Sequence, residues 1–121
     1  EHTINEGKTE AIIEGAGGCL VPLNRDHFVV DLIRKTGAEI VLVADLYLGS
    51  INHTLLTIEA LQRRNLFIRG IIFNGPANAE SENIILHHSK LRCLLKISRE
   101  QQITPDTVQR YAALLKSSWN G

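Results

Sequence analysis

The chain has 121 residues, enough for one domain with a hydrophobic core. Its 13 basic and 13 acidic residues balance, so charge gives no reason to expect binding to nucleic acid or to an anionic membrane. No apolar run is long enough to span a bilayer and no signal peptide is recognised, so we expect a cytoplasmic protein. Cys19 and Cys93 lack the spacing of a zinc site and are expected to be buried free thiols.

Near the N-terminus, Gly7-Lys8-Thr9 resembles the end of a phosphate-binding P-loop. That motif needs another glycine five residues before Gly7, and His2 stands there. The segment also leads into a predicted strand, whereas a P-loop lysine and threonine open a helix. We therefore reject a P-loop at this place.

Residues 11–23, AIIEGAGGCLVPL, form the first segment that is a candidate functional site. Residues 11–13 predict a short buried strand, Glu14 follows it, and residues 15–18 predict a tight turn of small residues. A carboxylate beside bare backbone N–H groups suits a metal ion and the oxyanions around it. A tight turn with a solvated glutamate fits these residues about equally well.

The rest of the chain alternates between helical and strand patterns. Gly37 predicts the end of the first helix, Ser50 the N-cap of the second and Thr104 the N-cap of the last. We expect Ile51, Leu55, Ile58 and Leu61 or Gln62 to form the buried stripe of the second helix. The predicted strands cover residues 40–44, 67–73 and 93–97, and the predicted helices cover residues 28–35, 51–64, from Asn78 or Ser81 to about 91, and from 105 towards Trp119.

This alternation predicts an α/β fold, with a parallel sheet, right-handed crossovers and helices on both faces. In such sheets ligands bind beyond the carboxyl ends of the strands. The topology therefore predicts one rim that gathers Glu14, Ser50, Asn52 and Asn74. The helix after Ser50 should also attract anions, because its first N–H groups are unpaired and its dipole favours negative charge there.

Three segments together resemble the dethiobiotin synthase family. They are IIEGAGGCLVPL at residues 12–23, IVLVADLYLGSINHTLLTIEAL at residues 40–61 and IRGIIFNG at residues 68–75. The resemblance implies a P-loop NTPase-like homodimer that uses Mg²⁺, ATP and CO₂ to convert 7,8-diaminononanoate into dethiobiotin, in biotin synthesis. One amine becomes a carbamate, the carbamate oxygen attacks the γ-phosphate, and the second amine displaces phosphate as the cyclic urea closes.

The resemblance also implies site residues. Glu14 matches the family's Mg²⁺-binding glutamate, and Gly17 and Gly18 fall where the backbone approaches the carbamate and the phosphates. These three are the implied catalytic residues. Asn74 matches the residue that hydrogen-bonds adenine. The substrate carboxylate would be held by the helix start of a neighbouring subunit, which is formed by Ser50, Ile51 and Asn52.

Two departures from the family matter. The family's P-loop lies in an N-terminal half that residues 1–121 do not contain. We therefore expect this chain to be the C-terminal portion of a single domain and to be inactive alone, since the phosphate-binding lysine is missing. Ser98 stands where the family has a proline in the loop near adenine, so we assign no nucleotide contact there. The alternative is a non-catalytic dimerising or interaction domain on the same fold, which the coding sequence upstream of Glu1 would distinguish.

Other polar residues have more than one interpretation. His53 fits either orientation of the substrate turn or a solvated position. Asp45 could act as a second carboxylate, although the resemblance places the metal on Glu14. Adjacent histidines on a helix point in different directions, so His87 and His88 predict a solvated face rather than a metal site. Tyr47 is expected to be a packing residue, as is Trp119.

Overall fold

A computed structural model describes residues 10–120; the rejected Gly7-Lys8-Thr9 segment lies outside the described residues. The chain divides into two compact units, Glu1–Ala38 and Glu39–Gly121. Among the described residues, no helix has the length and apolar character needed to cross a bilayer. Both cysteines are free and half-buried, so the predicted free thiols are confirmed, although neither is fully buried.

The first unit contains α1, Val29–Thr36, which ends at Gly37 as predicted. Residues 11–13 do not form the predicted strand, and Ile12 is 93% exposed. The prediction was wrong because a strand needs a hydrogen-bonded neighbour, and the described part of this unit offers these residues none. Of the predicted turn at residues 15–18, only a bend at residues 16 and 17 is formed; the hydrogen-bonded turn comes directly after it, where Val21 N donates to Gly18 O at 3.1 Å.

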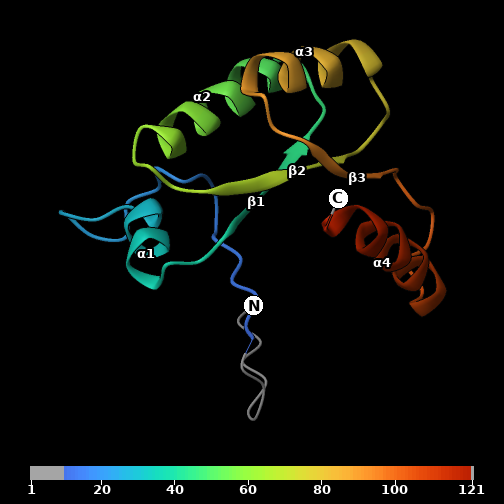
Figure 1. The fold of residues 1–121 in the computed structure, drawn as a ribbon, viewed down its shortest axis with the longest axis horizontal. Helices are drawn as coiled ribbons and strands as arrows, with labels where there is room; N and C mark the ends of the chain where they lie inside the picture. The colour runs from blue at the N-terminus through green and yellow to red at the C-terminus, as the bar shows by residue number, and fades with distance from the viewer. Residues whose placement is uncertain (1–9, 121) are drawn as a thin grey trace. The chain divides into compact units, whose positions relative to one another are not determined.

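The second unit is a parallel three-stranded sheet with helices on both faces. Its strands are β1 (Ile40–Asp45), β2 (Ile68–Asn74) and β3 (Cys93–Ile97), in the order β1-β2-β3. Its helices are α2 (Ser50–Gln62), α3 (Ala79–Ser89) and α4 (Pro105–Trp119). In Figure 1, α2 and α3 lie side by side over one face of the sheet and α4 lies on the other. The predicted α/β fold is therefore confirmed.

The most deeply buried side chains of this unit come from β2, α2 and α3. Ile71 and Phe73 of β2 are fully buried, as is Ile85 of α3. From α2, Ile58 and Leu61 are buried as predicted, but the rest of the buried stripe is Ser50 and Thr54 rather than Ile51 and Leu55, which are half-buried. The apolar periodicity of α2 was therefore a poor guide to its first turn.

An ion pair between a buried glutamate and an exposed lysine joins α3 to β3. Glu82 is 3% exposed, and its carboxylate accepts a hydrogen bond from Lys96 Nζ at 2.7 Å. This bond raises the pKa of the Lys96 ammonium, so the amine stays charged through neutral pH. A carboxylate removed from water is costly unless it is paired, so Lys96 makes it possible for Glu82 to be buried.

Removing the lysine should therefore destabilise the fold. Lys96→Met leaves the Glu82 carboxylate buried without its partner, and we expect a loss of about 2 kcal/mol. That lies below the ~3–5 kcal/mol of a fully buried pair, because the Lys96 side chain is 59% exposed. Urea unfolding followed by Trp119 fluorescence measures the change.

Two further variants complete this test. Arg63→Met breaks the exposed Glu59–Arg63 pair of α2 and should cost less than about 0.5 kcal/mol. Adding Glu82→Leu to Lys96→Met should recover most of the lost stability, because no buried charge remains. Equal costs for Lys96→Met and Arg63→Met would contradict this account of the pair.

The start of α4 is tied to the segment that precedes it. Thr104 is the N-cap of α4, as predicted, and accepts from Thr107 N at 3.3 Å. Glu100 accepts from Tyr111 Oη at 2.6 Å and from Arg110 Nη2 at 2.8 Å. Trp119 packs at the far end of the helix, with the Arg69 guanidinium 4.5 Å above its ring, as expected of a packing residue.

The Glu100 contacts predict a pH effect. The hydrogen bond from Tyr111, and then that from Arg110, lower the pKa of the Glu100 carboxyl below its ordinary value of 4.5. A depressed folded-state pKa stabilises the fold above that ordinary value, and the contribution is lost as the pH falls through the folded pKa. In a carbon-13 NMR titration, Tyr111→Phe should move the Glu100 midpoint upwards, and Arg110→Gln should move it less. A midpoint unchanged by Tyr111→Phe would rule out this cause.

Candidate functional site

The carboxyl ends of the three strands stand level with one another. Asp45 of β1 is paired with Asn74 of β2, and Asn74 is paired with Ile97 of β3. The ladder continues past the strands, since Leu46 N donates to Asn74 O at 3.2 Å and Gly75 N donates to Ile97 O at 2.9 Å. The predicted rim therefore exists in the second unit, and Asn74 lies on it.

The chain turns from this rim into α2 through a glycine. Gly49 is the N-cap of α2 and has φ +91°, a left-handed conformation that favours glycine. Ser50 is thus the first helical residue, so its prediction as the N-cap was wrong. Its hydroxyl sits on a side chain only 3% exposed, and its N–H donates to Tyr47 O at 3.0 Å. A glycine cap brings no side-chain oxygen to the helix end.

The absence of a side-chain cap leaves donors at the start of α2. Ser50 N is used by the turn, and His53 N donates to Gly49 O at 3.1 Å. Among the described residues, the backbone N–H groups of Ile51 and Asn52 have no acceptor. Two unpaired donors at the positive end of a helix dipole form a site suited to an oxyanion such as a carboxylate. Asn52 is itself exposed, so this helix end is open to a ligand.

Beside this helix end, Asp45 and Asn74 are exposed at the rim. Gly75 follows Asn74 directly and lies close to Asp45. It has φ +109°, and a Cβ placed on it would lie 2.8 Å from Asp45 Oδ1. The left-handed backbone favours glycine at position 75, whereas Asp45 Oδ1 is the end of an exposed side chain that can rotate away, so the contact itself adds little to this requirement. The proximity of this turn to Asp45 could not be predicted from the sequence.

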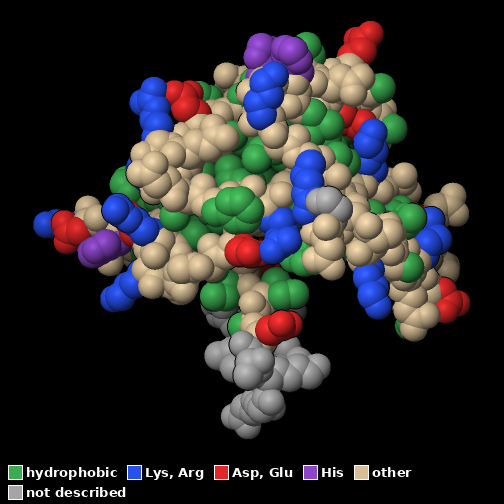
Figure 2. Space-filling view, viewed as in Figure 1, with side chains coloured by type: hydrophobic (Ala, Val, Ile, Leu, Met, Phe, Trp, Pro, Cys, Tyr) green, Lys and Arg blue, Asp and Glu red, His purple; other side chains and the backbone are tan. Residues whose placement is uncertain are grey.

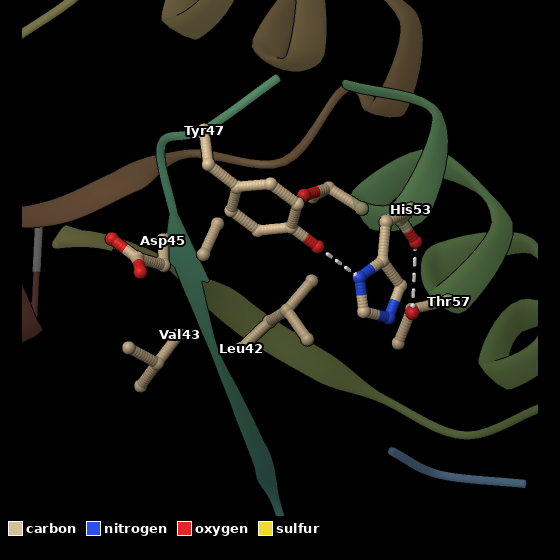
Figure 3. A pocket seen from close by; sticks show the side chains of 8 residues that line it. Leu42, Val43, Asp45, Tyr47, His53 and Thr57 are labelled. Carbon is tan, nitrogen blue, oxygen red and sulfur yellow. Dashed lines mark hydrogen bonds between the residues drawn. The ribbon is translucent and has the colours of Figure 1, made fainter. Parts of the chain in front are cut away.

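A hollow of about 170 Å³ lies between β1 and the first turns of α2. It is lined on the strand side by Leu42, Val43 and Asp45, and Tyr47 and His53 face each other across it (Figure 3). Tyr47 Oη lies 2.6 Å from His53 Nδ1. Tyr47 is 52% exposed, so its prediction as a packing residue was wrong. A tyrosine and a histidine six residues apart, one on each side of a turn, were the sequence signal for this pair.

The remaining predicted site residues belong to the first unit. Glu14 is exposed, Gly17 has φ +81°, and a Cβ on Gly18 would meet no atom within 4 Å. Gly17 is thus required by its backbone conformation, whereas the fold places no such demand on Gly18. The shared rim of Glu14 with Asn74 and α2 stays a prediction.

The described residues contain no cluster of three or more His, Cys, Asp or Glu side chains that could hold a metal ion. His87 and His88 are exposed on α3, and their rings meet edge to face at 86°. Histidine side chains gather at the surface at the top of Figure 2. The predicted solvated face is confirmed. A lone carboxylate such as Glu14 is still compatible with Mg²⁺, which keeps several waters and takes one or two carboxylates together with substrate phosphates.

Comparison with known proteins defines the class of this fold. A family model described as an AAA domain (AAA_26) matches residues 3–107, and the chain belongs to that family. The parallel sheet with its covering helices agrees with the P-loop NTPase-like fold of the family.

Within this class, the chain is similar to proteins named ATP-dependent dethiobiotin synthetase. One from Cytophaga hutchinsonii is 56% identical over 110 residues, which cover 91% of this chain and 53% of the relative. One from Chlamydia abortus is 43% identical over 121 residues, which cover 98% of this chain and 58% of the relative. The chain thus spans about half the length of the curated relatives it matches. The family resemblance found in the sequence is confirmed.

The positive φ of Gly75 predicts that any other residue is strained at this position. Gly75→Ala forces alanine into that backbone, whereas the Asp45 carboxylate that the new Cβ would meet can rotate away, so we expect a loss of about 1–2 kcal/mol. Thermal or urea unfolding measures it.

Gly37→Ala is the matched control, because Gly37 also has positive φ, +66°, but has open space where its Cβ would lie. It should cost about the same, ~1–2 kcal/mol, from backbone strain. A clearly larger loss for Gly75→Ala would contradict this account, because the contact with Asp45 would then add to the strain.

Proposed function

We propose that this chain is part of an ATP-dependent dethiobiotin synthetase, which carboxylates and cyclises 7,8-diaminononanoate with CO₂. The 56% identity over 110 residues to a protein of that name carries the proposal. The oxyanion site at the start of α2 supports it independently, because the proposed substrate has a carboxylate at one end. The structure and the sequence segment SINH thus favour the same chemistry at the same place.

In this proposal the substrate carboxylate accepts hydrogen bonds from the N–H groups of Ile51 and Asn52. The buried Ser50 fixes the first turn of α2 beneath that site. The family resemblance further suggests that the carboxylate belongs to a substrate bound by the neighbouring subunit of a homodimer. A carboxylate at a helix N-terminus gains about 0.3–1 kcal/mol from the dipole, in addition to its hydrogen bonds.

The nucleotide would lie along the rim. The exposed Asn74 amide offers both a donor and an acceptor, as recognition of an adenine edge requires. Gly17 and Gly18 would bring backbone N–H groups to the carbamate and the phosphates, and the open space at Gly18 supports this role. Glu14 would hold Mg²⁺, which when bound neutralises charge on the transferring phosphoryl group.

In the proposed reaction, these residues position the reacting groups and neutralise negative charge. The carbamate formed from one amine and CO₂ takes up the γ-phosphoryl group, and ADP leaves. The second amine then attacks the carbamoyl carbon, and inorganic phosphate leaves as the urea ring closes. Such phosphoryl transfer depends on aligned donors and neutralised charge rather than on a protein nucleophile. The half-buried Cys19 and Cys93 have no part in it.

The test uses the complete protein that carries these residues, with ATP, bicarbonate and 7,8-diaminononanoate. We expect formation of dethiobiotin and phosphate that requires all three together with Mg²⁺. Glu14→Gln keeps the size of the side chain but removes its charge, so it should lower turnover at least about 100-fold, or about 2.7 kcal/mol of barrier, while unfolding is unchanged.

Glu10→Gln is the matched control, because Glu10 is an exposed glutamate four residues earlier. It should keep wild-type turnover. A wild-type protein that forms no dethiobiotin would refute the proposed activity. Wild-type rates in Glu14→Gln would instead remove only Glu14 from the mechanism.

A further inference from the structure

Tyr47 and His53 join the turn after β1 to the first turn of α2. The 2.6 Å bond between Tyr47 Oη and His53 Nδ1 joins two residues that line the hollow, and their rings meet edge to face at 6.4 Å between centroids (Figure 3). Neither side chain is among the site residues that the family resemblance implies. Their bond therefore needs its own explanation.

His53 is the fixed partner in this pair. Its backbone N–H donates to Gly49 O at 3.1 Å, and its carbonyl accepts from Thr57 Oγ1 at 2.9 Å. These bonds secure His53 within α2. The side-chain bond consequently restrains Tyr47 and the turn that carries it.

The turn itself has little packing to hold it. Tyr47 is half exposed and Leu48 is fully exposed. Its restraints are therefore mainly hydrogen bonds, and segments of this kind open at low free-energy cost. Tyr47 is linked twice, since its hydroxyl bonds His53 and its carbonyl accepts from Ser50 N. Tyr47 thus fixes the residue immediately before the two unpaired N–H groups of Ile51 and Asn52.

We propose that Tyr47 and His53 are positioning residues for the oxyanion site at the start of α2. The inference rests on the proposed function, which places the carboxylate of 7,8-diaminononanoate on the Ile51 and Asn52 N–H groups. With the bond in place, the turn holds the first turn of α2 in one conformation and leaves both N–H groups open. Without it, the turn samples other conformations, and binding of the carboxylate weakens.

The experiment is steady-state kinetics on the complete protein. Tyr47→Phe keeps the ring and removes the hydroxyl, so the KM for 7,8-diaminononanoate should rise about three- to tenfold, the range expected for one hydrogen bond. The kcat and the KM for ATP should change less than about twofold, because the pair contacts neither the nucleotide nor the reacting atoms in this proposal. His53→Ala should have the same effect. His53→Asn should restore most of the affinity, because its side-chain amide can form a hydrogen bond with the tyrosine hydroxyl in place of Nδ1.

A double-mutant cycle and a matched control sharpen the result. Tyr47→Phe with His53→Ala should be no worse than either single variant, because both remove one bond. Tyr111→Phe changes the chain's other tyrosine and should leave the diamine KM unchanged. Calorimetric titration of each variant with dethiobiotin provides a second readout, in which affinity should fall by the same factor.

Failure here can be told apart from failure of the proposed function. A wild-type protein that neither turns over the diamine nor binds dethiobiotin refutes the function, and this inference with it. An active wild type whose diamine KM is unmoved by Tyr47→Phe overturns only the positioning role. A rise shared equally by the KM values for the diamine and ATP, or no rescue by His53→Asn, also overturns it, because a general loosening of the fold would then explain the effect.

Discussion

The level alignment of three strand ends is the constraint on which the rest of the site depends. Parallel pairing places Asp45, Asn74 and Ile97 side by side, and two backbone hydrogen bonds extend the ladder past them. The central strand carries Ile71 and Phe73 into the core, so the rim cannot shift along the strands without disturbing buried residues. The buried residues of β2 therefore hold the polar groups at this edge in fixed positions.

The helix ends of the second unit differ in a way that agrees with this arrangement. Asn78 and Thr104 cap α3 and α4 with side-chain oxygens, each worth about 1 kcal/mol. At α2 the cap is Gly49, which supplies no such oxygen. Of these three helices, α2 follows β1 at the rim, and α2 is the one that has no side-chain cap. Local stability is lower there, and the donors that a cap would occupy stay open.

Sequence patterns predicted most of the second unit, because long apolar runs and strong caps are local signals. The strands at residues 40–44 and 93–97, the turn at Gly37 and the cap at Thr104 all followed from them. Two kinds of feature did not. Residues 11–13 have strand composition, but pairing depends on a neighbour that composition does not reveal. The buried Ser50 and Thr54, and the bond of Tyr47 to His53, depend on how α2 is rotated against β1, which a polar first turn leaves undetermined.

The position of β1 in the sheet has a practical consequence. Among the residues that the structure describes, β1 is an outer strand of the sheet; its residues 40–44 carry no charge or proline, and Val43 in its middle is 59% exposed. Natural sheets usually protect such a strand with charge, proline or a covering element. Where no other strand pairs with it, β1 therefore offers unpaired backbone groups to a second molecule, and preparations of residues 1–121 should self-associate at high protein concentration.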